Sequence, residues 1–205
     1  MTSTTHRRDD AGGAFRDSPL KIRAATPADL TRLTEILADS FHSRAGLAGF
    51  MYPIFRLGIY EDLRNRLSSA SGYYACLVAT IPKSRSLLGP VPQNASEQLL
   101  GTVEMGLRSS SPWSVGDRYP YLSNLAVHPS FRRRGVAQTL LARCEQTALQ
   151  WGFSSLHLHV LENNHQARQL YFRAGYRLQE VSSGWDSLFF GQPRRLFLSK
   201  PLSPP

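Results

Sequence analysis

The sequence is short of cysteine, of acidic residues and of long apolar runs, and each shortage excludes a class of protein. Two cysteines, Cys76 and Cys144, are too few for a disulfide framework or a four-thiolate zinc site and favour a reducing compartment. No apolar run approaches the ~18 residues of a membrane-spanning helix, and the N-terminus lacks the apolar segment of a secretory signal. We therefore expect a cytoplasmic protein without membrane contact. A plastid location stays open if the Ser-, Thr- and Arg-containing N-terminus is a transit remnant.

The charge balance is strongly basic. Lysine and arginine number 24 against 15 aspartates and glutamates, which gives a formal net charge of +9. Such an excess indicates an anionic partner, which could be nucleic acid, a membrane surface or a phosphorylated small molecule. The apolar fraction of 41% over 205 residues is enough for one packed domain and excludes global disorder.

Hydrophobic periodicity predicts strands and helices in alternation. We expect a flexible tail at 1–19, one domain at 20–200 and a short C-terminal tail at 201–205. Period-two runs predict strands at 21–26, 73–81, 99–107, 121–127, 156–161, 176–181 and 195–198. Helical spacing predicts helices at 26–37, 53–67, 135–151 and 164–174. This alternation is typical of an α/β fold around one mixed sheet. Two irregular segments, 82–98 and 108–120, match no motif, and we expect them to contribute acceptor specificity.

The segment 121–141 carries the clearest chemical signal. A predicted strand ends, the chain turns through Arg132, Arg133, Arg134 and Gly135, and a long helix begins. The first helical turn leaves backbone N–H groups unpaired and carries partial positive charge, so a diphosphate is the expected ligand. A solvated basic turn before an ordinary amphipathic helix is the alternative interpretation.

Two linked motifs identify a family. The first is Arg-x-x-Gly-x-Ala from Arg132 to Ala137, and the second places Asn164, Tyr171, Gly175 and Tyr176 after the next strand. Together they resemble the GNAT superfamily of acyl-CoA N-acyltransferases, in particular protein N-terminal and lysine acetyltransferases of the cyanobacterial and plastid type. The resemblance implies a mixed sheet with helices on both faces and two splayed strands that hold acetyl-CoA.

The resemblance also implies where acetyl-CoA binds. Strands that separate leave backbone N–H and C=O groups free for the pantetheine amides, and the turn before the long helix surrounds the pyrophosphate. The predicted cosubstrate-binding residues are Leu125, Ala126, Val127, Arg132, Arg133, Arg134, Gly135, Val136, Ala137, Gln138, Asn163, Asn164 and Tyr171.

Acetyl transfer needs a base for the amine and a donor for the departing thiolate. Tyr171 matches the superfamily position of the thiolate donor. His159 and Tyr121 match a histidine and tyrosine that act together as the base, directly or through an ordered water, in some N-terminal acetyltransferases. Glu104 on a central strand is the reserve base. For the tyrosine and histidine positions, simple packing in the core or on a sheet face is the alternative.

The expected function is acetyl transfer from acetyl-CoA to a primary amine by direct attack in a ternary complex. We expect the acceptor to be a protein N-terminal α-amine, a lysine ε-amine, or both. The alternatives are a small-molecule N-acetyltransferase for a polyamine, aminoglycoside or amino acid, and a non-catalytic basic module that binds nucleic acid or CoA. His157 and His159 have zinc-like spacing without a third ligand, so no metal is expected. Nucleic acid is not the expected partner, and the oligomeric state stays open.

Overall fold

The computed structural model describes residues 20–41, 52–69, 72–82, 97–109, 118–182 and 193–203. The tail predicted at 1–19 and most of the irregular segments predicted at 82–98 and 108–120 lie outside these residues. In chain order the elements are β1 (Lys21–Ala24), η2 (Pro27–Asp29), α2 (Leu30–Phe41), α3 (Tyr52–Ser68), β2 (Tyr74–Pro82), β3 (Glu97–Ser109), β4 (Arg118–Val127), η5 (Pro129–Phe131), α4 (Val136–Gln150), β5 (Ser155–Leu161), α5 (His165–Arg173), β6 (Arg177–Ser182) and β7 (Arg195–Pro201).

The strands form one seven-stranded sheet in the order β1-β2-β3-β4-β5-β7-β6. Every neighbouring pair is antiparallel except β4 and β5, which are parallel. The parallel pair is connected by α4, as a crossover between parallel strands requires. The predicted α/β fold with a single mixed sheet is therefore confirmed.

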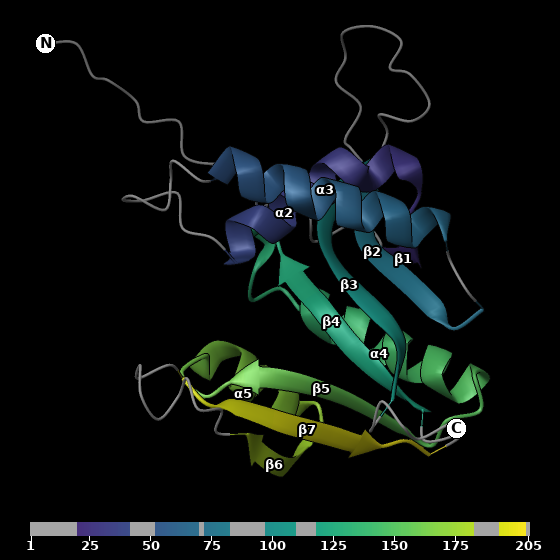
Figure 1. Cartoon of the computed structure of the whole chain (residues 1–205), viewed down its shortest axis with the longest axis vertical. Coiled ribbons are helices and arrows are strands. Elements are labelled where there is room, and N and C mark those ends of the chain that lie inside the picture. The colour runs from purple at the N-terminus through teal and green to yellow at the C-terminus, as the bar shows by residue number, and fades with distance from the viewer. Residues whose placement is uncertain are drawn as a thin grey trace, which may run out of the picture.

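Two hydrophobic cores lie on the two faces of the sheet. Alternate residues of β2 separate them, because Cys76 and Val78 pack with α2 and α3, whereas Leu77 and Ala79 pack with α4. Figure 1 shows α2 and α3 over β2, β3 and β4 on one side and α4 behind them. Helices on both faces are thus as predicted from the family resemblance.

The first helical region begins with a short 3-10 turn that the periodicity did not distinguish from the helix. The Asp29 carboxylate accepts hydrogen bonds from the Thr26 backbone N–H at 2.8 Å and from its hydroxyl at 2.9 Å. Pro27 follows at the start of the turn, where its fixed φ suits a helix. A backbone N–H at this position would have no partner within the helix, so its absence in proline costs nothing. At the other end of the chain, β7 continues to Pro201 and Leu202 is buried. The packed domain therefore extends two residues beyond the boundary predicted at residue 200.

Gly101 allows β3 to approach β4 closely at the end of the pair. A Cβ at this position would lie 2.7 Å from the Ala126 carbonyl oxygen and 3.3 Å from a methyl group of Val136. Backbone atoms on both strands fix this approach, so a methyl group cannot be accommodated without separating the strands.

We expect Gly101→Ala to lower the free energy of unfolding by about 1–3 kcal/mol through overpacking. Gly106→Ala, in the same strand, is the matched control because its Cβ would lie no closer than 3.8 Å to other atoms. Urea unfolding of both variants measures the difference. Equal stability of the two variants would contradict the close-approach explanation.

Candidate active site

Strands β4 and β5 pair over two positions only and then separate. The paired residues are Tyr121 with His157 and Leu122 with Leu158, although β4 runs on to Val127 and β5 to Leu161. Figure 1 shows the two arrows diverging toward their carboxyl ends. The backbone groups of residues 125–127 that face β5 therefore lack the partners that a continuous parallel ladder would supply.

A bulge in β4 turns its carboxyl half away from β5. Thr102 of β3 lies opposite Ala126 and Glu104 lies opposite Ser123, so two β4 residues share the single position opposite Val103. One of them, Asn124, has a φ of 52°, in the left-handed region that asparagine tolerates better than most residues. This extra residue bends the strand locally.

Glu104 holds the bulge in place. Its side chain is only 1% exposed, and one carboxylate oxygen accepts a hydrogen bond from the Asn124 amide at 2.6 Å. The other oxygen accepts from the Tyr74 hydroxyl at 2.9 Å and from the Arg66 guanidinium at 3.0 Å. Burial and the charge of Glu104 raise the pKa of Tyr74, which keeps that hydroxyl a donor. The predicted reserve base is thus placed in a network that orients Asn124.

A cavity of about 620 Å³ opens where the strands separate, between the start of α4 and one side of α5. Most of the predicted cosubstrate-binding residues line it. These are Leu125, Ala126, Val127, Arg132, Arg133, Gly135, Val136, Ala137, Gln138, Asn164 and Tyr171.

Two of the predicted cosubstrate-binding residues do not line this cavity. Arg134 points toward the Phe131 ring, with its guanidinium carbon 5.7 Å from the ring centroid. Asn163 contributes its carbonyl oxygen to the turn before α5, where it accepts from the His165 N–H. Asn164 both lines the cavity and caps α5, because its side-chain oxygen accepts from the Ala167 N–H at 3.1 Å.

The α5 side of the cavity contains residues that the motifs did not identify. Gln166, Gln169 and Arg173 line it together with Tyr171. Their spacing of three and four residues places them on one face of the helix. These residues lie two or five positions from Tyr171, outside the three- and four-residue spacing, so the motif tyrosine did not signal them.

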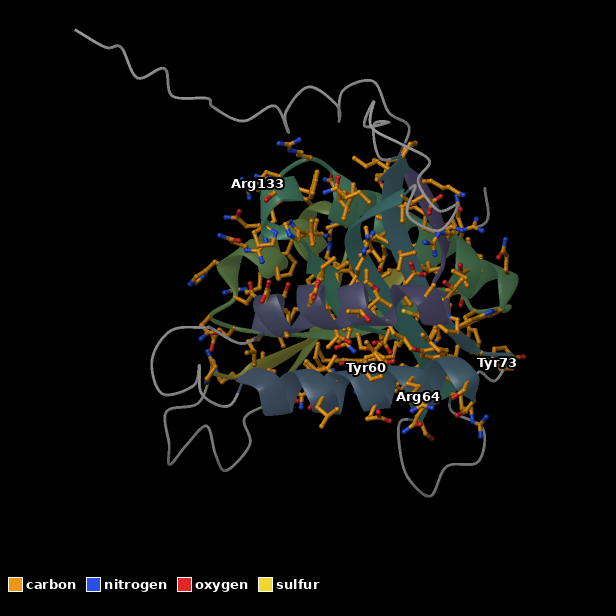
Figure 2. All side chains as sticks on the ribbon, turned by 90° about the horizontal axis from the view of Figure 1, so that it is seen from above. Tyr60, Arg64, Tyr73 and Arg133 are labelled. Atoms are coloured by element: carbon orange, nitrogen blue, oxygen red, sulfur yellow. The ribbon has the colours of Figure 1, made fainter. Side chains whose placement is uncertain are left out.

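The turn before α4 is shaped to bind an anion through its backbone. Arg133 has a φ of 64° and Gly135 a φ of 81°, and left-handed residues at such positions direct successive N–H groups into a concave nest. The Arg132 guanidinium donates to the Val127 carbonyl at 3.1 Å and so ties this turn to the end of β4. Figure 2 shows Arg133 on the side of the molecule away from α3.

Tyr121 and His159 meet across the β4–β5 junction. The Tyr121 hydroxyl lies 3.1 Å from the Nδ1 atom of His159, a direct hydrogen bond. Burial lowers the pKa of His159, and the positive charges of Arg195 and Arg108 lower it further, so the imidazole is neutral at pH 7. The side chains of His159 and Phe197 pack with ring centroids 4.8 Å apart.

Tyr171 lies within the cavity on α5 and is 8% exposed. Burial raises its pKa, as do the nearby Tyr121 and Cys144 side chains. The phenol therefore keeps its proton at neutral pH and remains a hydrogen-bond donor.

Neither a metal site nor a membrane span is found in the part of the chain that the structure describes. Within it, no three His, Cys, Asp or Glu side chains are grouped so as to share a metal ion. Likewise, no described helix is both long enough and apolar enough to cross a bilayer.

The sequence is similar to those of known acetyltransferases. The sequence profile of the Acetyltransferase (GNAT) family matches residues 56–176. GCN5-related N-acetyltransferase 10, chloroplastic, of Arabidopsis thaliana is 32% identical over 181 residues, which cover 85% of this chain and 68% of that protein. GCN5-related N-acetyltransferase 7, chloroplastic, of the same plant is 31% identical over 175 residues, covering 71% and 62%. The chain thus spans about two thirds of the length of these relatives.

A solved structure shares the fold at lower identity. Arabidopsis thaliana NAA60 in complex with acetyl-CoA superposes with a TM-score of 0.62 at 20% identity, over 89% of this chain and 98% of that one. The family profile covers more than half of the sequence, and the fold and the two motifs agree with it. The chain therefore belongs to the GNAT acetyltransferase family.

Proposed function

We propose that this GNAT protein acetylates a primary amine of a protein, either the N-terminal α-amine or a lysine ε-amine. Membership of the family makes the chain an acetyl-CoA-dependent N-acetyltransferase, and the proposal adds the acceptor and the residues. The observation that carries it is the Tyr121–His159 hydrogen bond beside a cavity that contains Tyr171. This combination matches the base and donor that the resemblance to protein acetyltransferases implies.

The proposed orientation of acetyl-CoA in the cavity follows from the groups that line it. The diphosphate would lie at the nest before α4, where Arg133 adds a full positive charge to the partial charge of the helix N-terminus. The pantetheine amides would pair with the free backbone groups of β4 at residues 125–127. The thioester would then lie at the narrow end of the opening, between the Tyr121–His159 pair and Tyr171.

The chain's own groups supply both proton transfers. The amine nitrogen attacks the thioester carbonyl carbon and passes a proton to neutral His159, whose imidazole accepts it directly or through water. The C–S bond breaks as the amide forms, and the departing thiolate takes a proton from the Tyr171 hydroxyl. His159 gives its proton to solvent, and Tyr171 regains one.

The two cysteines support direct transfer without a covalent acyl-enzyme. Cys76 and Cys144 are both buried. Burial and the charge of Glu104 raise the pKa of Cys76 to about 12, and burial also raises that of Cys144. A buried thiol that stays protonated is a poor nucleophile.

The names of the relatives bear on where the protein is located. The names of both Arabidopsis relatives contain "chloroplastic", which favours the plastid alternative. The cytoplasmic location expected from the sequence stays a prediction.

Mass spectrometry tests the acceptor directly. The 205-residue chain, incubated with acetyl-CoA and a peptide set, is expected to acetylate free N-termini, lysines in N-terminally blocked peptides, or both. A panel of polyamines, aminoglycosides and amino acids, followed by thiol release, is the comparison. Turnover of the small amines without any peptide product would contradict the protein acceptor, and no turnover with either set would contradict the proposed function.

His159→Gln tests the base. Because the pKa of His159 is lowered, wild-type kcat/KM should rise with pH through an inflection below the ordinary value of 6.5, separate from the further rise at higher pH as the acceptor amine loses its proton. The variant should lose this inflection and about a hundredfold in kcat. His157→Gln, two residues earlier on the same strand face, is the control. An unchanged profile in His159→Gln would remove this residue from the mechanism.

Gly135→Ala tests the diphosphate site. Both Gly135 and Gly152 have positive φ, at 81° and 86°, so an alanine at either position costs about 1–2 kcal/mol of strain. Only Gly135 shapes the nest, so only its variant should weaken acetyl-CoA binding, by about fivefold or more. Isothermal titration calorimetry of Gly135→Ala and the control Gly152→Ala measures this. Equal affinities would place the diphosphate elsewhere.

A further inference from the structure

We propose that the acceptor site selects an amine that lies beside negative charges, as in a peptide whose acetylated residue is followed by aspartate or glutamate. This inference rests on the proposed acetyl transfer and names the substrate class for it. Three exposed arginines carry the argument. Arg108 and Arg195 act on the Tyr121–His159 pair, and Arg118 shares a cavity with Arg108.

Arg108 approaches the pair from β3. Its guanidinium carbon lies 3.6 Å from the centroid of the Tyr121 ring, a close cation–π contact. Its backbone lies opposite Tyr119 in the β3–β4 ladder. Of the carboxylates in the described residues, none forms an ion pair with Arg108.

Arg195 approaches from the opposite side, on β7. Phe197 lies opposite His159, and Arg195 lies opposite Leu161, so alternation places Arg195 on the same sheet face as His159. The charges of Arg195 and Arg108 both act on His159, and Glu180 on β6 is the one carboxylate of the described residues found to oppose them. Positive charge therefore predominates at the position where the amine must arrive.

A second cavity lies beside Arg108. It measures about 400 Å³ and is lined by Tyr73, Leu107, Arg108, Ser109 and Arg118. In Figure 2, Tyr73 and Arg133 lie at opposite ends of the molecule, so this cavity is remote from the diphosphate nest. Arg108 lines this cavity and also contacts the Tyr121 ring, so the two arginines of the cavity can receive a carboxylate side chain of the acceptor.

The same charges have a second effect on the reaction. A positive field lowers the pKa of an acceptor ammonium, which increases the fraction of neutral, nucleophilic amine. It also repels polycations, so a polyamine or a lysine-rich segment binds poorly unless carboxylates accompany the amine.

Matched peptides provide the test. Three peptides of equal length would begin with the same residue and continue with Asp-Glu, Asn-Gln or Lys-Arg. We expect kcat/KM to fall in that order, by about tenfold from first to last, and the differences to shrink with added salt. Equal kcat/KM values for all three would overturn the inference and leave the acetyl transfer standing. Failure to acetylate any of them would count against the proposed function instead.

Variants locate the charges. Arg195→Gln should reduce the preference for the acidic peptide about threefold, and Arg195→Glu should reduce it further or reverse it. Arg143→Gln on α4, whose side chain bonds Gln146, is the matched control and should leave the preference unchanged. Losing the cation should also move the acid limb of the pH profile to higher pH, a change that a purely structural role would not produce. An unchanged preference and an unchanged acid limb in folded Arg195→Glu would contradict the assignment.

Discussion

One hydrogen-bonded carboxylate determines the shape of the active site. Glu104 is buried in the middle of the sheet and fixes Asn124 in a conformation that few residues adopt. That conformation produces the bulge, the bulge separates β4 from β5, and the separation opens the cavity. A buried carboxylate is costly unless donors surround it, and Tyr74, Arg66 and Asn124 supply them from three different elements. Arg66, which lies on α3, also forms an ion pair with Asp62 one turn earlier in that helix.

The proposed catalytic groups are kept in reactive protonation states by their surroundings. Burial and two nearby arginines keep His159 neutral, and burial keeps Tyr171 protonated. At neutral pH the free enzyme therefore holds a base and an acid at the same time, on opposite sides of the strand junction. Neither side chain is charged in this state. In the proposed acceptor site, the arginines that lower the pKa of His159 are also those that the acceptor meets. The same side chains would then set both the proton affinity of His159 and the charge preference for the substrate.

The sequence predicted what depends on local patterns. The Arg-x-x-Gly-x-Ala turn was found because a helix N-terminus, a glycine and adjacent arginines are close together along the chain, and alternation placed Tyr121 and His159 on strands. The sequence did not predict what depends on register or on distant strands. Arg108 and Arg195 flank His159 only because β3 and β7 are placed on either side of the β4–β5 pair. Gln166, Gln169 and Arg173 belong to no motif, and the polar ends of β3 and β4 extend beyond the predicted strands because backbone pairing holds them.

The separation of β4 from β5 also affects how the proposed cosubstrate site tolerates amino-acid substitutions. In the proposed binding mode, the pantetheine arm meets peptide N–H and C=O groups, which every residue except proline provides in full. Recognition of the pantetheine arm along β4 therefore depends on backbone conformation and not on which side chains are present. Substitutions at positions 125–127 can accumulate without loss of cosubstrate, provided that the bulge persists. Dependence on the backbone is consistent with a fold that this chain shares, at 20% sequence identity, with Arabidopsis thaliana NAA60 in complex with acetyl-CoA.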